Sequence, residues 1–400
     1  MSRIVFLITM GIERPSGQRY FNIARELVSR GSTVRILALH PDLVRCPQRR
    51  FVQDGVEIWY VGQMHSRKRN GETLPMRLRE LLWVLLSAVR GMIWGIICSP
   101  ADVYHLGKPQ PVNGMAGLIG ICGLRWQRFW VDCDDDEVTS NRFSSNWQVQ
   151  IFAFWQWLLP MLAAGVTVNT RFLANRMGQR GIKPVVYVPN GVDQAVFMRP
   201  PEHTLQALRT ALRLDGQRVI AYVGTIALHN HPVNLLLEGF RDYCTDPQVT
   251  LLLIGGGEDL SVVRRWIAVH GLTERIRCLG HLPPSVVAVY TALADVTVDP
   301  VYDNVVAQAR SPLKIFESLA LGIPVVAGAV GDRPTLLADG AAGILVAAGD
   351  TAALGQALND LLRNEPQRQQ LAQAAVGHVQ QYTWQYLAVT WERGYANEGK

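Results

Sequence analysis

Residues 311–328, SPLKIFESLALGIPVVAG, have the pattern of a helix followed by a buried strand. Ser311 is a favoured helix N-cap residue, and Pro312 suits the first helical position. Lys314 then falls in the first turn, where the positive end of the helix dipole disfavours a cation by about 0.3–1 kcal/mol. The conflict predicts that a negatively charged group binds at the start of this helix.

Lys314 and Glu317 are three positions apart and therefore share one face of the predicted helix. A helix N-terminus with an added ammonium group suits phosphate. A carboxylate on the next turn can accept hydrogen bonds from the two hydroxyls of a ribose. Together they predict a nucleotide site. The alternative is that Lys314 extends into solvent and pairs only with Glu317.

On both sides of this segment, short runs rich in valine, isoleucine and leucine alternate with helical segments. Such alternation predicts βαβ units and parallel sheets. The pattern restarts after VPNGVDQAVFMRPPEH, residues 188–203, whose Asn-Gly turn and Pro-Pro pair are typical of a domain junction. We therefore expect an α/β protein with two doubly wound Rossmann-like domains, 1–195 and 196–378. A C-terminal helix at 379–400 is expected to pack back toward the first domain. Ligands bind beyond the carboxyl ends of such strands, which predicts a cleft between the domains.

The composition narrows the classes of protein and of partner. The chain has 400 residues, 48% of them hydrophobic and 18% charged, which supports two cores and argues against disorder. Six cysteines without a C-x-x-C pair argue against zinc and disulfides and favour the cytoplasm. The first residues, MSRIVFLITMGIERPSG, are typical of a buried strand rather than a signal peptide. Residues 1–195 hold 23 Lys and Arg against 14 Asp and Glu, a balance of +9, and the remainder hold 16 against 19, a balance of −3.

Taken in order, several motifs resemble those of the retaining family 4 glycosyltransferases of GT-B fold, and the resemblance runs almost end to end. VPNGVDQAVF is similar to their interdomain junction, and VTLLLIGGGED, residues 249–259, to their strand and glycine turn. RIRCLGHLPPSVVAVYTALADVTVDP, residues 275–300, is similar to the strand, helix and strand that follow. SPLKIFESLALGIPVVA is similar to the nucleotide-sugar helix of a subgroup with S-P-x-K ahead of the glutamate.

The resemblance implies a hexosyltransferase-type enzyme of the GT-B fold, with its two domains facing each other across the cleft. It would move a sugar from a nucleotide-diphosphate donor to a hydroxyl acceptor, a glycan or a lipid-linked molecule, with retention of configuration. Cell envelope polysaccharide biosynthesis in the cytoplasm is the expected setting. The nucleotide sugar is a substrate, and no obligatory cofactor or metal is expected, because enzymes of this fold stabilise the leaving diphosphate with helix ends and cations.

The resemblance also assigns donor-binding residues. Glu317 would hold the ribose, and Lys314 would face the diphosphate together with Ser311 and Pro312. The other expected donor contacts are Ser16, Gly17, Gly224, Thr225, His281 and Leu282. A glycine in the turn RPSGQRY fits independently, since only glycine lets the backbone approach a phosphate so closely; an ordinary strand-to-helix loop is the alternative.

Two positions depart from the family pattern. Ala309 stands where the family has a second acid that contacts the transferred sugar. Asp303 or Asn304 is the candidate to replace that acid. TIALHNHPVN, residues 225–234, lacks the usual arginine and lysine, although it offers His229 and His231 as phosphate contacts. The identity of the sugar therefore stays open, and Lys314 becomes the expected main cation for the diphosphate.

The acceptor side is predicted in the first domain. VDCDDDE, residues 131–137, ends a strand, and Asp134 and Asp135 could orient an acceptor hydroxyl. His105 and Lys108, in YHLGKPQP, end another strand. His105, Asp134 and Asp135 are thus candidate catalytic residues beside Lys314 and Glu317. The carboxylate run would also suit a divalent metal, and a solvated loop with one N-cap is the remaining alternative.

Two segments of the first domain are apolar on nearly every helical face: residues 81–99, LLWVLLSAVRGMIWGIICS, and 147–162, WQVQIFAFWQWLLPML. Arg90 and the βαβ context argue against a membrane span. We expect first-domain helices, at least one of which meets a membrane interface, with buried packing as the alternative. The basic charge of this domain favours an anionic membrane surface as a partner, on the cytoplasmic face, rather than nucleic acid.

Two other functions are compatible with the same scaffold. A sugar-nucleotide epimerase would need acids and bases around the sugar, which Ala309 makes harder. A non-catalytic, membrane-peripheral relative of the transferases would explain the altered motif positions.

Overall fold

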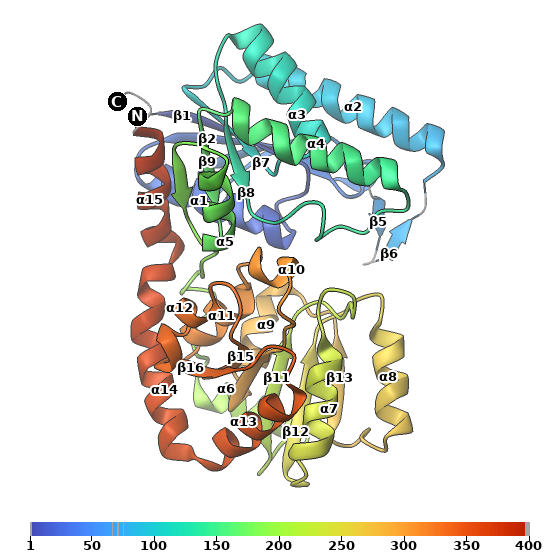
Figure 1. Cartoon of the computed structure of the whole chain (residues 1–400), viewed down its shortest axis with the longest axis vertical. Helices are drawn as coiled ribbons and strands as arrows, with labels where there is room; N and C mark the ends of the chain where they lie inside the picture. The colour runs from blue at the N-terminus through green and yellow to red at the C-terminus, as the bar shows by residue number, and fades with distance from the viewer. Residues whose placement is uncertain (1, 66, 70–71, 75, 397–400) are drawn as a thin grey trace. The chain divides into compact units, whose positions relative to one another are not determined.

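The structure, a computed structural model, describes residues 2–65, 67–69, 72–74 and 76–396 (Figure 1). The chain divides into two compact units, Met1–Pro189 with Trp384–Lys400, and Asn190–Thr383. The division falls at Pro189, ahead of the expected boundary at residue 195. Asn190 belongs to the second unit because its backbone N–H and its side-chain amide donate hydrogen bonds to Ser311.

The first unit is built on an eight-stranded sheet with the order β10-β9-β8-β7-β1-β2-β4-β3. Every neighbouring pair is parallel except β3 and β4. The strands are β1 (Arg3–Ile8), β2 (Thr33–His40), β3 (Arg50–Gln53), β4 (Val56–Gln63), β7 (Val103–Gly107), β8 (Trp130–Cys133), β9 (Gly165–Val168) and β10 (Val185–Tyr187). A separate hairpin joins β5 (Arg67–Arg69) and β6 (Glu72–Leu74).

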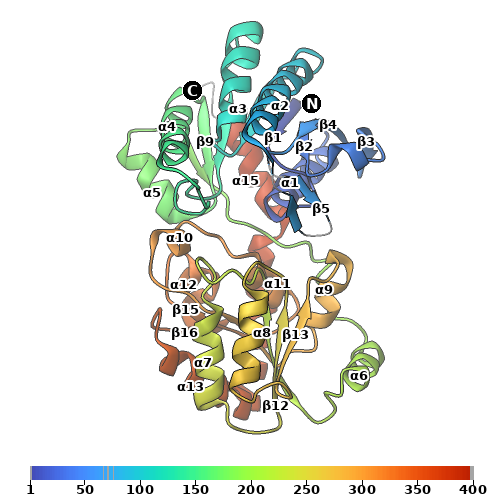
Figure 2. The same ribbon diagram turned by 90° about the vertical axis from the view of Figure 1, so that its right-hand side faces the viewer.

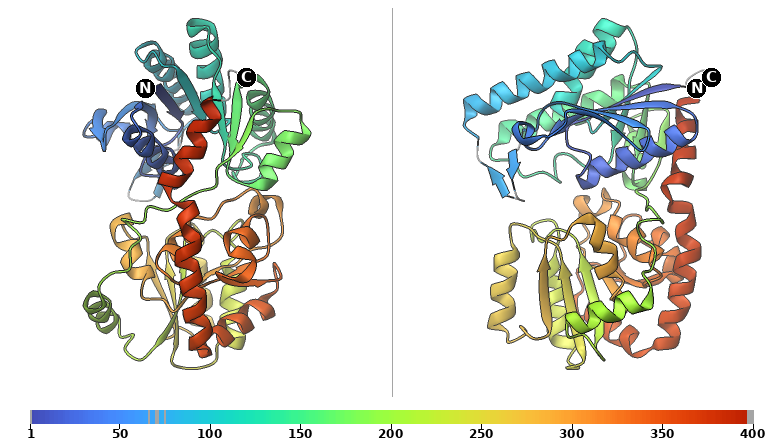
Figure 3. Two further views of the ribbon diagram at one scale, coloured as in Figure 1. Left: turned by 90° about the vertical axis from the view of Figure 1, so that its left-hand side faces the viewer. Right: turned by 180° about the vertical axis from the view of Figure 1, so that it is seen from behind.

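Helices cover both faces of this sheet. They are α1 (Pro15–Ser29), η1 (Leu43–Arg45), α2 (Leu78–Ile97), α3 (Pro111–Ala116), η2 (Gly117–Leu124), α4 (Asn146–Leu162), α5 (Arg171–Gln179) and α15 (Trp384–Ala396). Figure 3 shows α2, α3 and α4 on one face of the sheet and α1 with α15 on the other. The C-terminal helix α15 packs against α1, within the first unit.

The second unit has a six-stranded, fully parallel sheet with the order β13-β12-β11-β14-β15-β16. The strands are β11 (Arg218–Val223), β12 (Val249–Ile254), β13 (Ile276–Gly280), β14 (Val296–Asp299), β15 (Val325–Gly328) and β16 (Gly343–Val346). This is the doubly wound Rossmann order, in which the direction of strand addition reverses between β11 and β14.

The helices of the second unit again flank the sheet (Figure 2). They are α6 (Glu202–Ala211), α7 (Val233–Tyr243), α8 (Leu260–Val269), α9 (Pro284–Thr291), α10 (Val305–Gln308), α11 (Leu313–Ala320), α12 (Arg333–Leu336), η3 (Ala338–Gly340), α13 (Thr351–Arg363), α14 (Glu365–His378) and η4 (Val379–Tyr382). Strand β12 is buried along its whole length, as expected of a parallel strand covered on both faces. The prediction of two doubly wound α/β domains is confirmed.

Candidate functional site

The candidate donor site lies in the second unit, where the carboxyl ends of β11 and β14 adjoin. Open α/β sheets bind ligands at this reversal of strand order, because the flanking loops diverge there. Strand β11 is followed by Gly224 and Thr225, and β14 ends at Asp299. The next long helix, α11, places its N-terminus beside both strand ends, as the contact of Lys314 with Asp299 and Tyr222 shows.

The start of α11 differs by one residue from the expected cap. Pro312 is the N-cap residue, and the helix begins at Leu313. Within the described part of the chain, no side chain caps its first turn. The Ser311 hydroxyl instead accepts a hydrogen bond from the backbone N–H of Asn190, at 3.0 Å. The predictions of Ser311 as N-cap and Pro312 as first helical residue are therefore wrong, because the junction residue Asn190 binds the hydroxyl.

Lys314 is not in solvent, nor paired with Glu317 alone. Its Nζ lies 3.1 Å from Asp299 Oδ1 and 4.1 Å from the centroid of the Tyr222 ring. Burial acts to lower the pKa of Lys314, but Tyr222 and Asp299 outweigh it and raise that pKa above its ordinary value. The side chain is therefore a fixed cation at the helix N-terminus, and the solvent-exposed alternative is wrong.

Asp299 holds two cations in place. Arg333 Nε donates to its second oxygen at 2.8 Å, and the Arg333 side chain is 2% exposed. Although burial acts to raise the pKa of Asp299, Arg333 and Lys314 bring it below the usual range. One carboxylate thus faces two positive charges, which leaves this cluster with one uncompensated positive charge.

Arg310 adds a further cation that the sequence alone did not single out. Its Nη1 donates to the carbonyl of Asn230 at 3.1 Å and lies 3.5 Å from both ring nitrogens of His231. Burial lowers the pKa of His231 to about 3, with the charges of Arg310 and Lys314 acting in the same direction. His231 is therefore neutral, and the positive charge beside it belongs to Arg310.

Glu317 lies half-buried one turn beyond Lys314. Burial raises the pKa of Glu317 to about 7, against the opposing charge of Lys314. Among the residues that the structure describes, no hydrogen bond to its carboxyl group is found. A carboxyl group in this state is suited to accepting hydrogen bonds from ligand hydroxyls.

The glycine at the end of β11 brings the backbone close to Lys314. Gly224 has a φ of 147°, and a Cβ built on it would lie 3.3 Å from Lys314 Nζ. A side chain here would thus crowd the ammonium group. Thr225 follows with an exposed side chain, while its carbonyl accepts a hydrogen bond from Tyr222.

The remaining predicted donor residues of this unit follow β13, two strands away from β11 in the sheet. His281 follows β13 with an exposed side chain, and a Cβ added to Gly256 would lie 3.4 Å from the His281 Cβ. Leu282 packs partly into the core. Ala309, at the position of the missing acid, is fully buried, while Asp303 accepts a hydrogen bond from Gln308.

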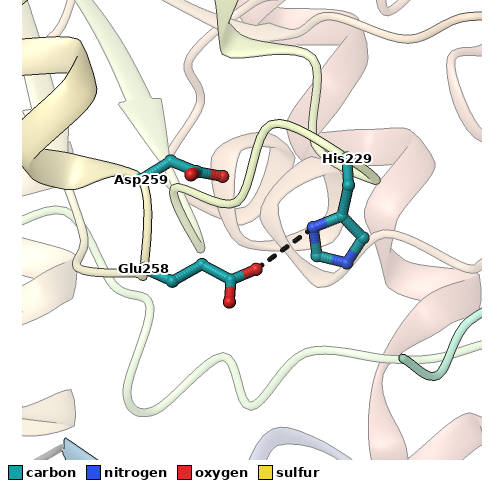
Figure 4. A group of neighbouring side chains, drawn as sticks. All are labelled: His229, Glu258 and Asp259. Atoms are coloured by element: carbon teal, nitrogen blue, oxygen red, sulfur yellow. Dashed lines mark ion pairs between the residues drawn. The ribbon is translucent and has the colours of Figure 1, made fainter. Parts of the chain in front are cut away.

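Unlike its neighbour His231, which lies beside Arg310, His229 pairs with Glu258. Its Nδ1 lies 3.2 Å from Glu258 Oε1, and Asp259 lies nearby (Figure 4). These three side chains are close enough to share an ion, but Asp259 also accepts a hydrogen bond from the backbone N–H of Leu228, at 2.7 Å. The group is accounted for by loop packing and carries no metal assignment.

In the first unit, Ser16 and Gly17 lie in the first turn of α1, which follows β1 after the loop of residues 9–14. A Cβ on Gly17 would lie 2.1 Å from the carbonyl oxygen of Gly11. The contact between the turn and its own backbone therefore already requires glycine at this position. Their contact with donor phosphate stays a prediction.

His105 is corrected from a catalytic to a core residue. It is 0% exposed; its Nδ1 lies 2.7 Å from the Tyr395 hydroxyl and its Nε2 3.2 Å from Thr167 Oγ1. Its ring also stacks on Phe6, with Trp391 beside it. Burial lowers the pKa of His105 to about 3. A neutral imidazole enclosed in this way cannot reach an acceptor.

The acidic run after β8 forms a buried ion cluster around Lys108. Lys108 Nζ lies 3.0 Å from Asp134, 3.2 Å from Asp135 and 3.2 Å from Glu137. Burial raises the pKa of Asp134 to about 7, although Lys108 opposes the shift. The solvated-loop alternative is wrong. Asp135, with a side chain 23% exposed, is the more accessible of the two predicted acceptor residues.

A second buried ion pair was not anticipated. Arg19 on α1 donates to Asp132 on β8 at 2.9 Å, and also to the carbonyls of Val188 and Pro189. Both charged side chains are almost fully enclosed. The pair ties α1 to β8 and to the last residues before the second unit.

Two protein-family models match this chain, one in each unit. The family described as "Glycosyl transferase 4-like domain" matches residues 16–191, and "Glycosyl transferases group 1" matches residues 206–377. A D-inositol 3-phosphate glycosyltransferase of Corynebacterium aurimucosum is 29% identical over 53% of this chain. A phosphatidyl-myo-inositol mannosyltransferase of Mycobacterium leprae is 30% identical over 51% of it. The chain spans about half the length of these curated relatives, 51% of each.

Solved structures resemble the whole chain in fold. Sucrose-phosphate synthase from Thermosynechococcus elongatus has a TM-score of 0.77 at 18% identity, covering 99% of both chains. Anabaena HepE in complex with UDP and glucose has a TM-score of 0.74 at 17% identity, covering 99% of this chain and 100% of that one. At this identity the likeness concerns the fold alone.

Proposed function

Because the chain belongs to the glycosyltransferases of GT-B fold, we propose that it transfers a hexose from a nucleoside-diphosphate sugar to a hydroxyl acceptor, with retention of anomeric configuration. The observation that carries the proposal is a set of three cations near the carboxyl ends of β11 and β14: Lys314 and Arg333 pair with Asp299, and Arg310 lies beside His231. We assign it to the S-P-x-K subgroup of family 4, on the sequence SPLKIFE.

The charge of the cluster fits a diphosphate leaving group. Three cations against one carboxylate leave a balance of +2, and the diphosphate linkage of a nucleotide sugar carries two negative charges. The uncapped N–H groups of α11 add hydrogen-bond donors for the same oxygens. In transfer, the bond from the anomeric carbon to the diphosphate breaks, and the departing oxygen gains charge that Lys314 and Arg310 stabilise. The acceptor hydroxyl forms the new bond and releases its proton to the leaving phosphate.

Asp299 and Arg333 act as positioning residues. Asp299 orients the Lys314 ammonium, and Arg333 keeps Asp299 ionised and in place. Glu317 accepts the ribose hydroxyls, which gives its unpartnered carboxyl group hydrogen bonds on ligand binding. An epimerase would need an acid or base near the sugar, and the fully buried Ala309 offers neither.

The acceptor is proposed to be a glycan or a lipid-linked alcohol at the cytoplasmic face of the membrane, within cell-envelope polysaccharide biosynthesis. Support comes from the names of the relatives, which act on inositol phosphate and on phosphatidyl-myo-inositol. Asp135 is the proposed acceptor contact, and it lies 3.2 Å from Lys108 Nζ, which it shares with Asp134 and Glu137.

A thermal-shift screen with UDP, GDP, ADP and TDP sugars tests donor binding, since a ligand that binds only the folded protein raises its Tm. Transfer of labelled sugar from the binding donor to extracted lipids and glycans then tests the reaction. Absence of a shift with every donor would contradict the proposal.

Replacing Arg310 by alanine is expected to weaken donor binding and turnover together, by about tenfold to a hundredfold, which is the effect of losing a charged hydrogen bond. Arg310→Lys keeps the charge and should recover part of the loss. His229→Ala is the matched control in the neighbouring loop, because His229 pairs with Glu258 instead. Steady-state kinetics with varied donor distinguishes the three; equal loss in the control would contradict the assignment.

Donor affinity is expected to fall as the pH decreases below about 7. The pKa of Glu317 is about 7 in the free site, so above that pH the carboxylate accepts both ribose hydroxyls, and below it a proton competes with them. We expect roughly tenfold weaker binding of an intact nucleotide sugar at pH 5.5 than at pH 7.5. Glu317→Gln should bind weakly at both pH values. Calorimetry measures the two affinities, and a wild-type affinity independent of pH would contradict this role.

A further inference from the structure

One surface of the first unit, formed by several helices, carries an unusual concentration of exposed apolar side chains. Of the 24 large apolar residues found exposed in the described part of the chain, fourteen lie between residues 82 and 162. They include all five exposed tryptophans, which are Trp83, Trp94, Trp126, Trp147 and Trp157. A soluble monomer seldom gathers so many on one surface, so this face is suited to a partner.

The exposed residues follow helical spacing on two helices. On α2 they include Trp83, Leu86 and Trp94, and on α4 Trp147, Phe154 and Trp157. Figures 2 and 3 show α2, α3 and α4 on the same side of the sheet, and α3 contacts both of the other helices. We refer to the outward side of α2, η2 and α4 with Trp126 as the aromatic face.

The opposite side of α2 is locked into the fold. A Cβ on Gly91 would lie 2.1 Å from the carbonyl oxygen of Val61, and one on Gly95 would lie 2.8 Å from Leu37. Residues Arg79–Ile97 are long and apolar enough to cross a membrane, but Met92 and Ile96 are fully buried in the unit. Lipid contact through the aromatic face requires no unfolding. If α2 crossed the membrane instead, it would have to detach from β4.

Basic side chains accompany the aromatic face. Residues 77–98, 117–128 and 142–162 together hold six arginines and one glutamate, a balance of +5. Arg79, Arg90, Arg128 and Arg142 are exposed, and Glu80 is the one acid. Two copies of the chain meeting through this face would bring +5 against +5, so a second copy is disfavoured. Tryptophan and arginine on one helical surface are instead typical of membrane interfaces, where the rings lie at head-group depth.

We propose that the aromatic face docks on a bilayer rich in anionic head groups, with the tryptophans in the interface and the arginines on the phosphates. The inference deepens the proposed function, because it names the surface through which a lipid-linked acceptor would be met. Only the biological role of the docking rests on the proposed function. The docking itself is measured without a donor and without sugar transfer.

Vesicle co-sedimentation tests the docking. The full chain is expected to bind phosphatidylcholine vesicles containing phosphatidylglycerol at least about tenfold more tightly than pure phosphatidylcholine, and to lose that preference in high salt. The variant Trp83→Ser with Trp157→Ser should bind anionic vesicles about tenfold more weakly. Its control, Val262→Ser with Val269→Ser, removes two exposed apolar side chains of α8 in the second unit and should bind like the wild type.

Charge is tested in the same way. Arg79→Gln with Arg90→Gln should weaken binding to anionic vesicles and leave the weak binding to neutral vesicles unchanged. Arg264→Gln with Arg265→Gln, two exposed arginines of α8, is the control. Equal binding by the tryptophan variant and its control would overturn the proposal. So would concentration-dependent dimerisation of the wild type that the tryptophan variant abolishes without any vesicle binding. Donor-induced thermal shifts should persist in all variants, so a failed docking and a failed donor assignment give different results.

Discussion

Lys314→Ala is expected to lower kcat by two to three orders of magnitude, the size of effect seen when one preorganised donor to a developing negative charge is removed. Lys314 is the cation at the N-terminus of α11, held by Asp299 at 3.1 Å and by the Tyr222 ring. The remaining cations, Arg310 and Arg333, are already hydrogen-bonded to protein groups. Each would have to give up its present hydrogen bonds to take the position of the lost ammonium group.

The loss should appear in kcat more than in the donor KM, because the charge on the leaving oxygen develops in the transition state. Lys314→Arg is the matched variant: it keeps the charge but not the geometry beside Gly224, and should recover only part of the rate. Thermal melting of each variant separates lost chemistry from lost folding. A kcat of Lys314→Ala within a factor of three of the wild type would remove the diphosphate role.

Arg19→Met is expected to destabilise the first unit by about 3–5 kcal/mol, because it leaves the buried Asp132 carboxylate without its cation. The backbone carbonyls of Val188 and Pro189 also lose their donor. Thermal unfolding should begin roughly 10 °C lower. Arg19→Met combined with Asp132→Asn should recover a large part of the stability, since the amide carries no charge.

The pH dependence of that variant follows from the same pair. With Arg19 present, its charge outweighs burial and lowers the pKa of Asp132; without it, burial alone would raise that pKa above the unfolded value. The native carboxyl would then bind a proton that the unfolded chain releases, so the destabilisation of Arg19→Met should grow as the pH rises from 5 to 8. The double variant should show no such slope. A single variant that melts like the wild type at both pH values would contradict the structural role.

The sequence predicted the strands of the second sheet because its buried parallel strands are largely continuous apolar runs, as in β12. It placed Lys314 and Glu317 on one helix face correctly, since their spacing is local. The cap at Ser311 could not be predicted, because its hydroxyl binds Asn190, 121 residues away. The contact between Arg333 and Asp299 could not be predicted either, because only the tertiary structure brings these two residues together.

His105 illustrates a different limit. In a strand that is buried on both faces, alternation does not indicate which side chain ends in the core, and a histidine near a strand end looks like a site residue. Its enclosure depends on Tyr395 and Trp391 of α15, and Tyr395 lies 290 positions along the chain. The burial of the acidic run 134–137 could likewise not be predicted, because only the fold brings Lys108 into its centre.

The chain leaves the first unit at Pro189 and returns to it at Trp384. The second unit is consequently one uninterrupted segment, which a single gene fragment covering residues 190–383 would encode whole. A fragment stopping at residue 189 would instead lack Trp391, which is completely enclosed beside His105 and Phe6. Expressed separately, residues 190–383 should be obtained as a soluble product, and residues 1–189 should aggregate unless α15 is supplied as a fusion or a peptide.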